Sequence, residues 1–218
     1  MITMTVQHNL NEELLLGYAA GILPEAFDLV VASHLSLSDQ SRCDLGAYDA
    51  VGGTILEDTP CQTMSSDALR NCFARIDNAG HVQPPKPANT NKDILPKPLQ
   101  NYVVGDIDKV KWKNLGGGVK QSILQTSGDA VARLLYIPAG KAVPDHGHQG
   151  TELTLVLQGA FQDEVDRFAR GDIEIANEEL EHTPIAEAGE DCICLAATDA
   201  PLRFNALIPR LLQPLFKI

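Results

Sequence analysis

Three metal-binding side chains lie within seven positions of one another, and this spacing constrains the fold of the chain more than any other feature. His146, His148 and Glu152 stand between Gly140 and Gly159. Residues two apart on a β-strand share a face, so both imidazoles would leave the backbone on the same side. Glu152 has the same parity, and a hairpin or a continuing strand would bring its carboxylate to the same point. The pattern therefore predicts a metal site on β-structure.

His182 is a candidate fourth ligand further along the chain. Imidazoles combined with one carboxylate suit zinc, and also iron, nickel or manganese. A lone histidine is more often a surface or core residue. Because three ligands stand here at these spacings between apolar runs, a metal site is the better interpretation.

Length, charge and cysteine content set limits on the class of protein. A chain of 218 residues can bury one good core or two small ones. The net charge of −12 argues against direct binding of nucleic acid. The five cysteines have no disulfide-framework spacing, which indicates reduced thiols. No apolar run is long enough to span a membrane, and the first residues lack the pattern of a secretory signal, so we expect a cytoplasmic protein.

A proline-rich segment divides the chain. Residues 81–98 contain five prolines, which withhold backbone donors and favour extended chain, so this segment is predicted to be a linker. Residues 1–80 then form a helical domain and residues 99–218 a β domain. The part before the linker has the larger net negative charge for its length, because basic residues are scarce there: residues 1–85 carry a net charge of −8.

Apolar periodicity predicts four helices before the linker. They cover residues 12 to about 20 with Asn11 as the N-cap, residues 24–34, residues 41–52, and a stretch from residue 65 or 66 onward. In the fourth helix, Leu69, Cys72, Phe73 and Ile76 form an apolar stripe, from which we expect Cys72 to pack in a core.

After the linker the pattern changes to short strands. They are predicted at residues 130–138, 153–158, 172–176, 192–197 and 202–207, separated by turn residues. Gly116–Gly118 lack the lysine of a phosphate-binding loop and are predicted to form a turn or bulge before a strand at Val119. The fold class is therefore α+β with two domains, the second a sandwich or barrel.

The spacing of the metal-binding residues resembles the first motif of the cupin family. The second cupin motif is present in outline at Gly171, Asn177, Glu179 and His182, although the family usually has Pro and Gly in place of Asn177 and Glu179, and Asn in place of Ala186. The resemblance implies a double-stranded β-helix barrel that holds one metal through His146, His148, Glu152 and His182.

Both halves together resemble the ChrR-type anti-sigma factors. The resemblance covers nearly the whole chain, and the segments that carry it are Tyr18–Gly21, Leu23–Glu25, Ser33–Leu37, Asp49–Gly53, Trp112, Leu115–Gly118, Pro144–His148, Glu152–Gly159, Cys192–Asp199 and Pro201–Asn205. It implies that the helical domain binds an extracytoplasmic-function sigma factor. It also implies that the cupin domain controls release in response to singlet oxygen or related oxidants. An acidic domain suits such a partner, because sigma factors expose basic surface.

The chain departs from the family at a second metal site. The family holds zinc in its helical domain through an N-terminal histidine and a histidine followed by two cysteines. His8 and His34 match the histidines, but Ser38 and Ser41 stand where the cysteines would be. A hydroxyl is a poor zinc ligand, and Cys43 is out of register. Either this domain folds without zinc or its site is distorted, and we expect no zinc there.

The cysteine pair Cys192 and Cys194 allows two interpretations. Two positions apart on a strand, they share a face but are poorly placed for an unstrained disulfide. They are either small buried apolar residues or oxidant sensors, and the second role requires an accessible thiolate.

Rival functions also remain open. The same ligand set supports cupin metalloenzymes of the dioxygenase type, and a third reading is a small-ligand sensor without anti-sigma activity. The sequence identifies no separate general acid or base, and a helical domain has no obvious task in an enzyme. We therefore expect a regulator that is not an enzyme, with neither nucleic acid nor membrane as a partner. Cupin barrels often pair, so a homodimer is an open alternative to a monomer.

Overall fold

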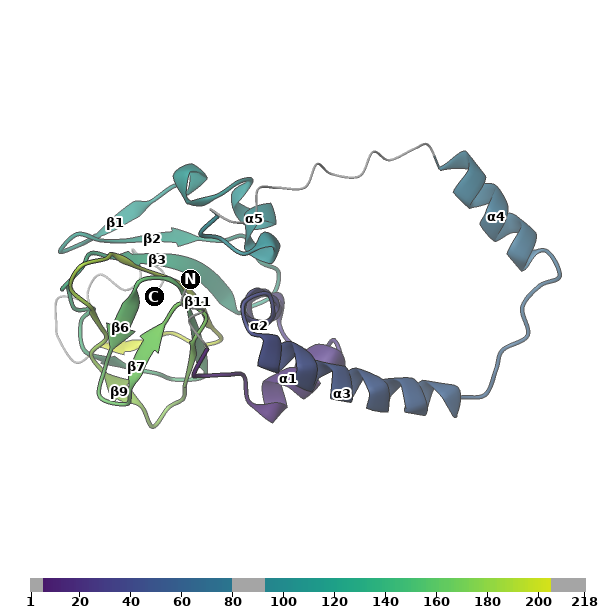
Figure 1. Cartoon of the computed structure of the whole chain (residues 1–218), viewed down its shortest axis with the longest axis horizontal. Coiled ribbons are helices and arrows are strands. Elements are labelled where there is room, and N and C mark those ends of the chain that lie inside the picture. Colours follow the sequence, from purple (N-terminus) through teal and green to yellow (C-terminus); the bar gives the residue numbers. More distant parts are fainter. Residues whose placement is uncertain (1–5, 80–92, 205–218) are drawn as a thin grey trace.

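The computed structural model describes residues 6–79 and 93–204. Its helices are α1 (Glu12–Ala19), α2 (Glu25–Leu35), α3 (Asp39–Glu57), α4 (Ala68–Asn78), α5 (Lys97–Val103) and the short 3-10 helix η1 (Ile107–Lys109). The strands are β1 (Lys113–Gly116), β2 (Val119–Ile123), β3 (Val131–Ile137), β4 (His146–Gly147), β5 (Glu152–Gln158), β6 (Ala160–Gln162), β7 (Arg167–Ala169), β8 (Ile173–Ala176), β9 (Glu181–His182), β10 (Ile185–Ala186), β11 (Cys192–Thr198) and β12 (Arg203–Phe204). A helical N-terminal part thus precedes a β domain, as predicted (Figure 1).

The β domain is a sandwich of three antiparallel sheets. The largest has the strand order β1-β2-β3-β11-β5-β8, and the two smaller ones have the orders β10-β6-β7 and β12-β4-β9. Four of the predicted strands are present with small shifts at their ends. The fifth is limited to β12 in the described residues, and the rest of its predicted range lies outside them. Gly116–Gly118 form the turn between β1 and β2 at φ angles of 110°, 60° and 90°, which confirms the predicted turn.

Alternation along the central strand β11 separates two cores. Ile193, Leu195 and Ala197 belong to a core that also contains residues of α1, α2, β3 and β5. Cys192 and Cys194 face the other way, into a smaller core with Phe161 and Phe168 of the small sheet β10-β6-β7. Both faces of the large sheet are therefore covered, one by helices and one by strands.

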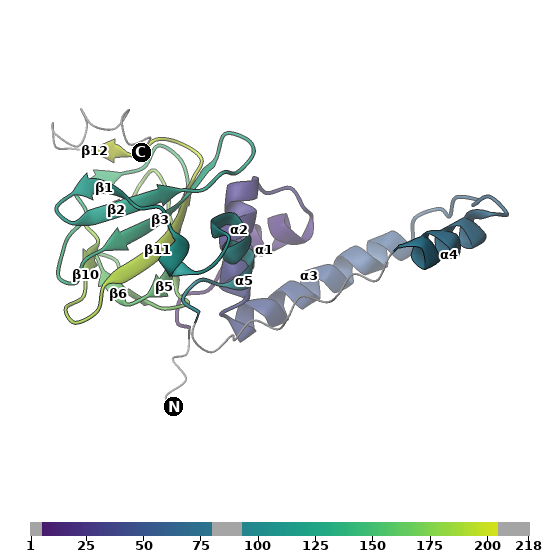
Figure 2. The ribbon, with the colours of Figure 1, turned by 90° about the horizontal axis from the view of Figure 1, so that it is seen from above.

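The helical part packs on the sheet instead of standing alone. Helix α2 lies against the large sheet in both views (Figures 1 and 2), and its Val30 and Val31 are fully buried. Asn11 caps α1 as predicted, since its side chain accepts a hydrogen bond from the Leu14 N–H at 2.9 Å. Helix α3 begins earlier than expected, because Ser38 caps it by accepting from the Ser41 N–H at 3.1 Å.

The apolar face of helix α4 is exposed to solvent, although its pattern predicted packing in a core. Its apolar stripe is present, but Leu69, Phe73 and Ile76 are 67%, 56% and 61% exposed. No residue of α4 is buried, and Cys72 is exposed, so the expectation that Cys72 packs in a core is wrong. Figure 1 shows α4 standing apart from the remainder of the described chain. An amphipathic pattern requires an apolar partner, and the described residues do not supply one.

The predicted linker falls mostly outside the described residues. At its end, Leu95 is buried and its N–H donates to Asp106 Oδ1 at 2.8 Å. Leu99 of α5 is buried in the same core as α2. Among the helices that the structure describes, none is long and apolar enough to cross a lipid bilayer.

Candidate metal centre

Three histidines meet at the end of the small sheet β12-β4-β9. His146 of β4 and His182 of β9 are directly opposite in the antiparallel register, and His148 follows β4. The Nε2 atom of His182 lies 3.3 Å from Nε2 of His146 and 3.3 Å from Nε2 of His148. All three side chains are buried. Strand pairing thus brings together three of the four predicted ligands.

Hydrogen bonds fix the tautomers of two of these histidines. Nδ1 of His146 lies 2.8 Å from the carbonyl oxygen of Pro144. Nδ1 of His182 lies 2.8 Å from Asp163 Oδ2 and 3.1 Å from Glu174 Oε1. An acceptor at Nδ1 requires the proton on Nδ1, so the neutral form of each imidazole has a free lone pair on Nε2. These lone pairs are directed toward the common point.

The arrangement fits a divalent metal ion. Zinc–imidazole bonds of about 2.0–2.1 Å at tetrahedral angles separate the nitrogen atoms by roughly 3.3 Å, which matches the separations here. Neutral imidazole lone pairs at that distance repel each other unless a cation or a proton lies between them. His146, His148 and His182 can therefore hold one metal.

Glu152 lies beside this group without joining it. Its Oε2 is 3.3 Å from Nδ1 of His148, and its Oε1 accepts from the Thr154 hydroxyl at 3.1 Å. Although these two atoms, His148 Nδ1 and Glu152 Oε2, are close, they do not meet the geometry of a hydrogen bond. Each is buried without a hydrogen-bond partner among the described residues. A compact group of ligand atoms forms from the three histidines without the glutamate. The carboxylate contacts His148 and lines the same cavity as His146 and His182.

Carboxylates around His182 form a second layer. Burial lowers the pKa of His182, but Glu174 and Asp163 outweigh that effect and raise it to about 9. Burial raises the pKa of Glu174 to about 7. Burial also acts to raise the pKa of Asp163, but hydrogen bonds from Glu174, from His182 and from nearby backbone hold it at about 2. Asp163 is therefore ionised, and its carboxylate stabilises positive charge at His182, whether that charge comes from a second proton on Nε2 or from a metal ion that replaces this proton.

Burial has opposite effects on His146 and Glu152. It lowers the pKa of His146, which favours the neutral form that a metal needs. It raises the pKa of Glu152, but His148, His146 and Arg133 outweigh it, and the pKa ends below its usual range. This part of the centre therefore combines a neutral His146 imidazole with an ionised Glu152 carboxylate.

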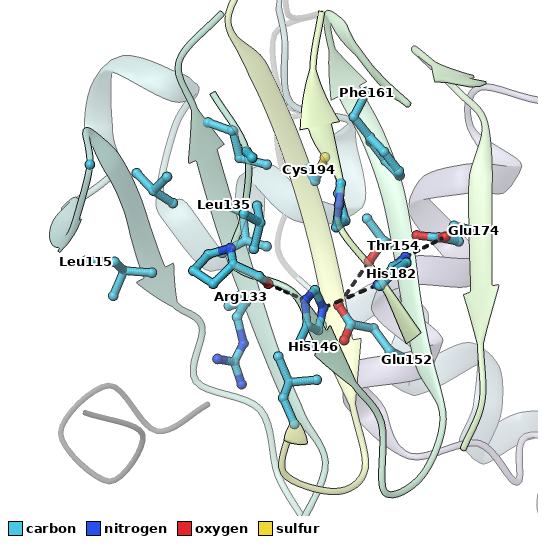
Figure 3. A pocket seen from close by; sticks show the side chains of 18 of the residues that line it. Leu115, Arg133, Leu135, His146, Glu152, Thr154, Phe161, Glu174, His182 and Cys194 are labelled. Carbon is cyan, nitrogen blue, oxygen red and sulfur yellow. Dashed lines mark hydrogen bonds and ion pairs between the residues drawn. The ribbon is translucent and has the colours of Figure 1, made fainter. Parts of the chain in front are cut away.

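A cavity of about 340 Å³ opens from the metal-binding group into the β domain. His146, Glu152, His182 and Arg133 lie at one end, and most of the remaining wall is apolar, including Leu115, Leu135, Phe161 and Cys194 (Figure 3). A cavity of this size can admit a small molecule to the metal.

The paired cysteines of β11 are buried. Cys192 Sγ and Cys194 Sγ are 3.5 Å apart, and Cys194 lines the cavity. The hydrogen bond from Cys192 and burial raise the pKa of the Cys194 thiol well above its usual value. The described state therefore holds a neutral thiol instead of a thiolate at Cys194.

Sequence reasoning did not single out Asp163, Glu174 or Arg133. A signal for two of them exists. Glu174 and Arg133 are charged residues within short apolar strands, at alternating positions whose side chains point into the β domain, where an unpaired charge is costly. Asp163 follows β6 and gave no such signal.

The positions of the family's second zinc site are not gathered for metal binding. His34, Ser38 and Ser41 lie close together, but His8 contacts Asp166. In the described residues, neither of the two groups of three potential ligands includes His8 or His34.

Known proteins resemble the chain along its whole length. The family model described as the ChrR cupin-like domain matches residues 100–201. The anti-sigma-E factor ChrR of Cereibacter sphaeroides is 58% identical over 215 residues, which cover 99% of this chain and all of that protein. The crystal structure of Rhodobacter sphaeroides SigE in complex with the anti-sigma ChrR matches with a TM-score of 0.79 and 55% identity, over 89% of this chain and 100% of that chain.

Proposed function

Since the chain belongs to the family of ChrR-type anti-sigma factors, we propose that it sequesters an extracytoplasmic-function sigma factor through its helical part. The related chain forms a complex with SigE, and the similarity extends over the helices as well as the β domain. The sigma factor would thereby be kept from RNA polymerase.

The observation that carries this proposal is an unpartnered apolar surface. On α3, Val51, Ile55 and Leu56 are 59%, 66% and 72% exposed. A second exposed apolar stripe, Leu69, Phe73 and Ile76, lies on α4, which stands apart from α3 (Figure 1). We call these two stripes together the α3–α4 surface. Exposed apolar side chains gathered on amphipathic helices are typical of a surface that binds a partner. The net charge of −8 on residues 1–85 favours a basic partner.

The β domain would regulate release. We place one metal, zinc in the first instance and iron, nickel or manganese as alternatives, at His146, His148 and His182, with Glu152 as the fourth ligand or as the partner of His148. Singlet oxygen or a related oxidant acting at this domain would shift the population toward a state that releases the sigma factor. The proposed units are residues 1–80 as a four-helix anti-sigma domain, residues 81–98 as a linker and residues 99–218 as a closed cupin barrel, in a cytoplasmic protein that is a regulator and not an enzyme.

One observation favours a second candidate function. The cavity beside the three histidines could hold a small substrate or ligand, as in a dioxygenase-like cupin or a ligand sensor. Oxygen consumption by the metal-loaded chain would support the enzyme. Retention of the sigma factor without oxygen consumption supports the regulator.

Co-expression of the full chain with the sigma factor encoded beside its gene tests the proposal. We expect the two to co-purify as a stoichiometric complex, and to separate when Phe73→Ala and Ile76→Ala are introduced together into α4. Asn71→Ala, on the polar side of the same helix, is the matched control and should leave the complex intact. Absence of a complex with the unaltered chain would refute the anti-sigma assignment.

A further inference from the structure

A small buried polar cluster joins the N-terminal segment to the turn between α2 and α3. It consists of Asn9, His34, Ser38 and Ser41. His34 and Ser41 have no exposed surface, and Ser38 is 1% exposed. In the family that this chain resembles, zinc would be expected here. Buried polar groups require partners, so the hydrogen bonds of the cluster decide whether a metal is needed.

Hydrogen bonds within the protein satisfy the hydroxyl groups and the amide oxygen of this cluster, while Nδ1 of His34 is buried without a hydrogen-bond partner among the described residues. The hydroxyl groups of Ser38 and Ser41 donate to Asn9 Oδ1 at 2.7 and 3.1 Å. With its own proton committed, Ser41 Oγ accepts from His34 Nε2–H at 2.9 Å. Ser38 Oγ accepts from the Ser41 N–H at 3.1 Å. The hydroxyl groups thus both donate and accept, and they have the partners that a metal would otherwise supply.

His8 is occupied elsewhere. Its Nε2 lies 3.1 Å from Asp166 Oδ2, and its ring centroid is 4.4 Å from that of Phe168. Its backbone N–H donates to Asp172 Oδ1 at 3.0 Å, and its carbonyl oxygen accepts from the Ile173 N–H at 3.2 Å. The histidine that corresponds to a zinc ligand is therefore a contact between the N-terminal segment and the β domain.

We propose that the cluster of Asn9, His34, Ser38 and Ser41 replaces zinc as the structural junction of the helical part, so that this part folds without metal. Neither the serine hydroxyls nor the asparagine offers a thiolate to a metal or to an oxidant. Chelation and thiol oxidation cannot open this junction. Metal chemistry in the described part of the chain is then confined to the β domain. The proposal rests on the family assignment within the proposed function, but not on sigma binding.

Metal content of the full chain tests the first half of the proposal. The unaltered chain, expressed with ample zinc, should hold about one equivalent of metal per chain. The triple variant His146→Ala, His148→Ala, His182→Ala should hold close to none. Two equivalents in the unaltered chain would overturn the proposal. So would about one equivalent that survives in the triple variant and is lost on adding His34→Ala.

Thermal unfolding tests the structural half. Asn9→Ala removes the acceptor of both hydroxyls, so we expect the unfolding midpoint to fall by several degrees while metal content stays unchanged. Asn101→Ala, at an exposed position of α5, is the matched control and should leave the midpoint unaltered. An unchanged midpoint in Asn9→Ala would contradict the junction. None of these measurements uses a sigma factor, so failure of sigma binding would leave their outcome interpretable.

Discussion

At the scale of single residues, the structure places three of the four predicted metal ligands, His146, His148 and His182, close together. Strand parity predicted that His146 and His148 share a face, whereas His182 was a candidate from further along the chain that the pairing of β9 with β4 brings opposite His146. The position of Glu152 beside Nδ1 of His148 did not follow from spacing, because side-chain rotation decides it. Asp163 could not have been found either, because it precedes His182 by 19 residues and only the folded β domain brings the two side chains to 2.8 Å.

Asp163 should tune the metal centre without binding the metal. Its carboxylate holds the Nδ1 proton of His182 at 2.8 Å, and such charged partners raise the basicity of a metal-binding imidazole. We expect Asp163→Asn to weaken metal affinity about 10- to 100-fold. Competition with a chromophoric chelator measures this. Asp129→Asn, at an exposed position, is the control, and equal affinities in the two variants would exclude the proposed role.

His34 should make stability depend on pH. Burial lowers its pKa from 6.5 to about 4 in the folded chain. Between pH 6.5 and about 4, His34 is therefore protonated in the unfolded state but neutral in the folded state. Its contribution to the free energy of unfolding is fully present above pH 6.5 and is lost as the pH falls toward 4. One such group costs about 1.4 kcal/mol per pH unit, and roughly 3 kcal/mol over the whole interval. Chemical denaturation of the unaltered chain and of His34→Gln measures it. The variant should show the shallower loss, and identical slopes would contradict the buried neutral histidine.

At the scale of elements, periodicity predicted where helices and strands occur, but it did not predict what each of them packs against. The stripe on α4 was recognised, yet it faces solvent, because periodicity shows that a face is apolar and not what covers it. Helix α2 shows the reverse case. Its burial depends on the large sheet, which no local pattern before the linker could reveal.

Helix α4 should contribute little to stability. We expect Phe73→Ala to leave the free energy of unfolding nearly unchanged, because this side chain is 56% exposed. Phe161→Ala, at 1% exposure in the smaller core, should cost about 3–5 kcal/mol. Urea denaturation of both variants measures the difference. A large loss for Phe73→Ala would mean that α4 packs within this chain, which would remove the argument for the α3–α4 surface.

The cysteines of different elements should differ in reactivity. Cys43, Cys61 and Cys72 are exposed, while Cys192 and Cys194 of β11 are buried. A thiol-specific reagent at neutral pH should label the three exposed thiols rapidly and the β11 pair only after unfolding. Mass spectrometry of labelled peptides measures this. Rapid labelling of Cys194 in the folded chain would show an accessible thiolate, and the buried-thiol assignment would then fail.

At the scale of the whole molecule, the order of a helical part before a β domain followed from the proline-rich segment and the change of period. The sequence pattern did not predict that the helical part and the β domain share one hydrophobic core. Leu14 and Val30 of the helices lie in one cluster with Leu134 and Leu195 of the sheet. This continuity of packing gives the β domain a physical route to the helices, because a shift of the sheet must be accommodated by α2.

The proposed division of labour makes a clear prediction for sigma binding. The α3–α4 surface binds the sigma factor, whereas the three histidines hold the metal that regulates release. Loss of the metal ligands should therefore leave basal sigma binding intact, while loss of apolar contact on α4 should weaken it.

The dissociation constant of the complex with the sigma factor encoded beside the gene, measured in reducing buffer for three full-length chains, tests this most directly. Phe73→Ala should bind at least about tenfold more weakly than the unaltered chain, equivalent to about 1.4 kcal/mol. The variant His146→Ala, His148→Ala, His182→Ala should bind as tightly as the unaltered chain. Loss of binding in the triple-histidine variant with full binding in Phe73→Ala would contradict the account.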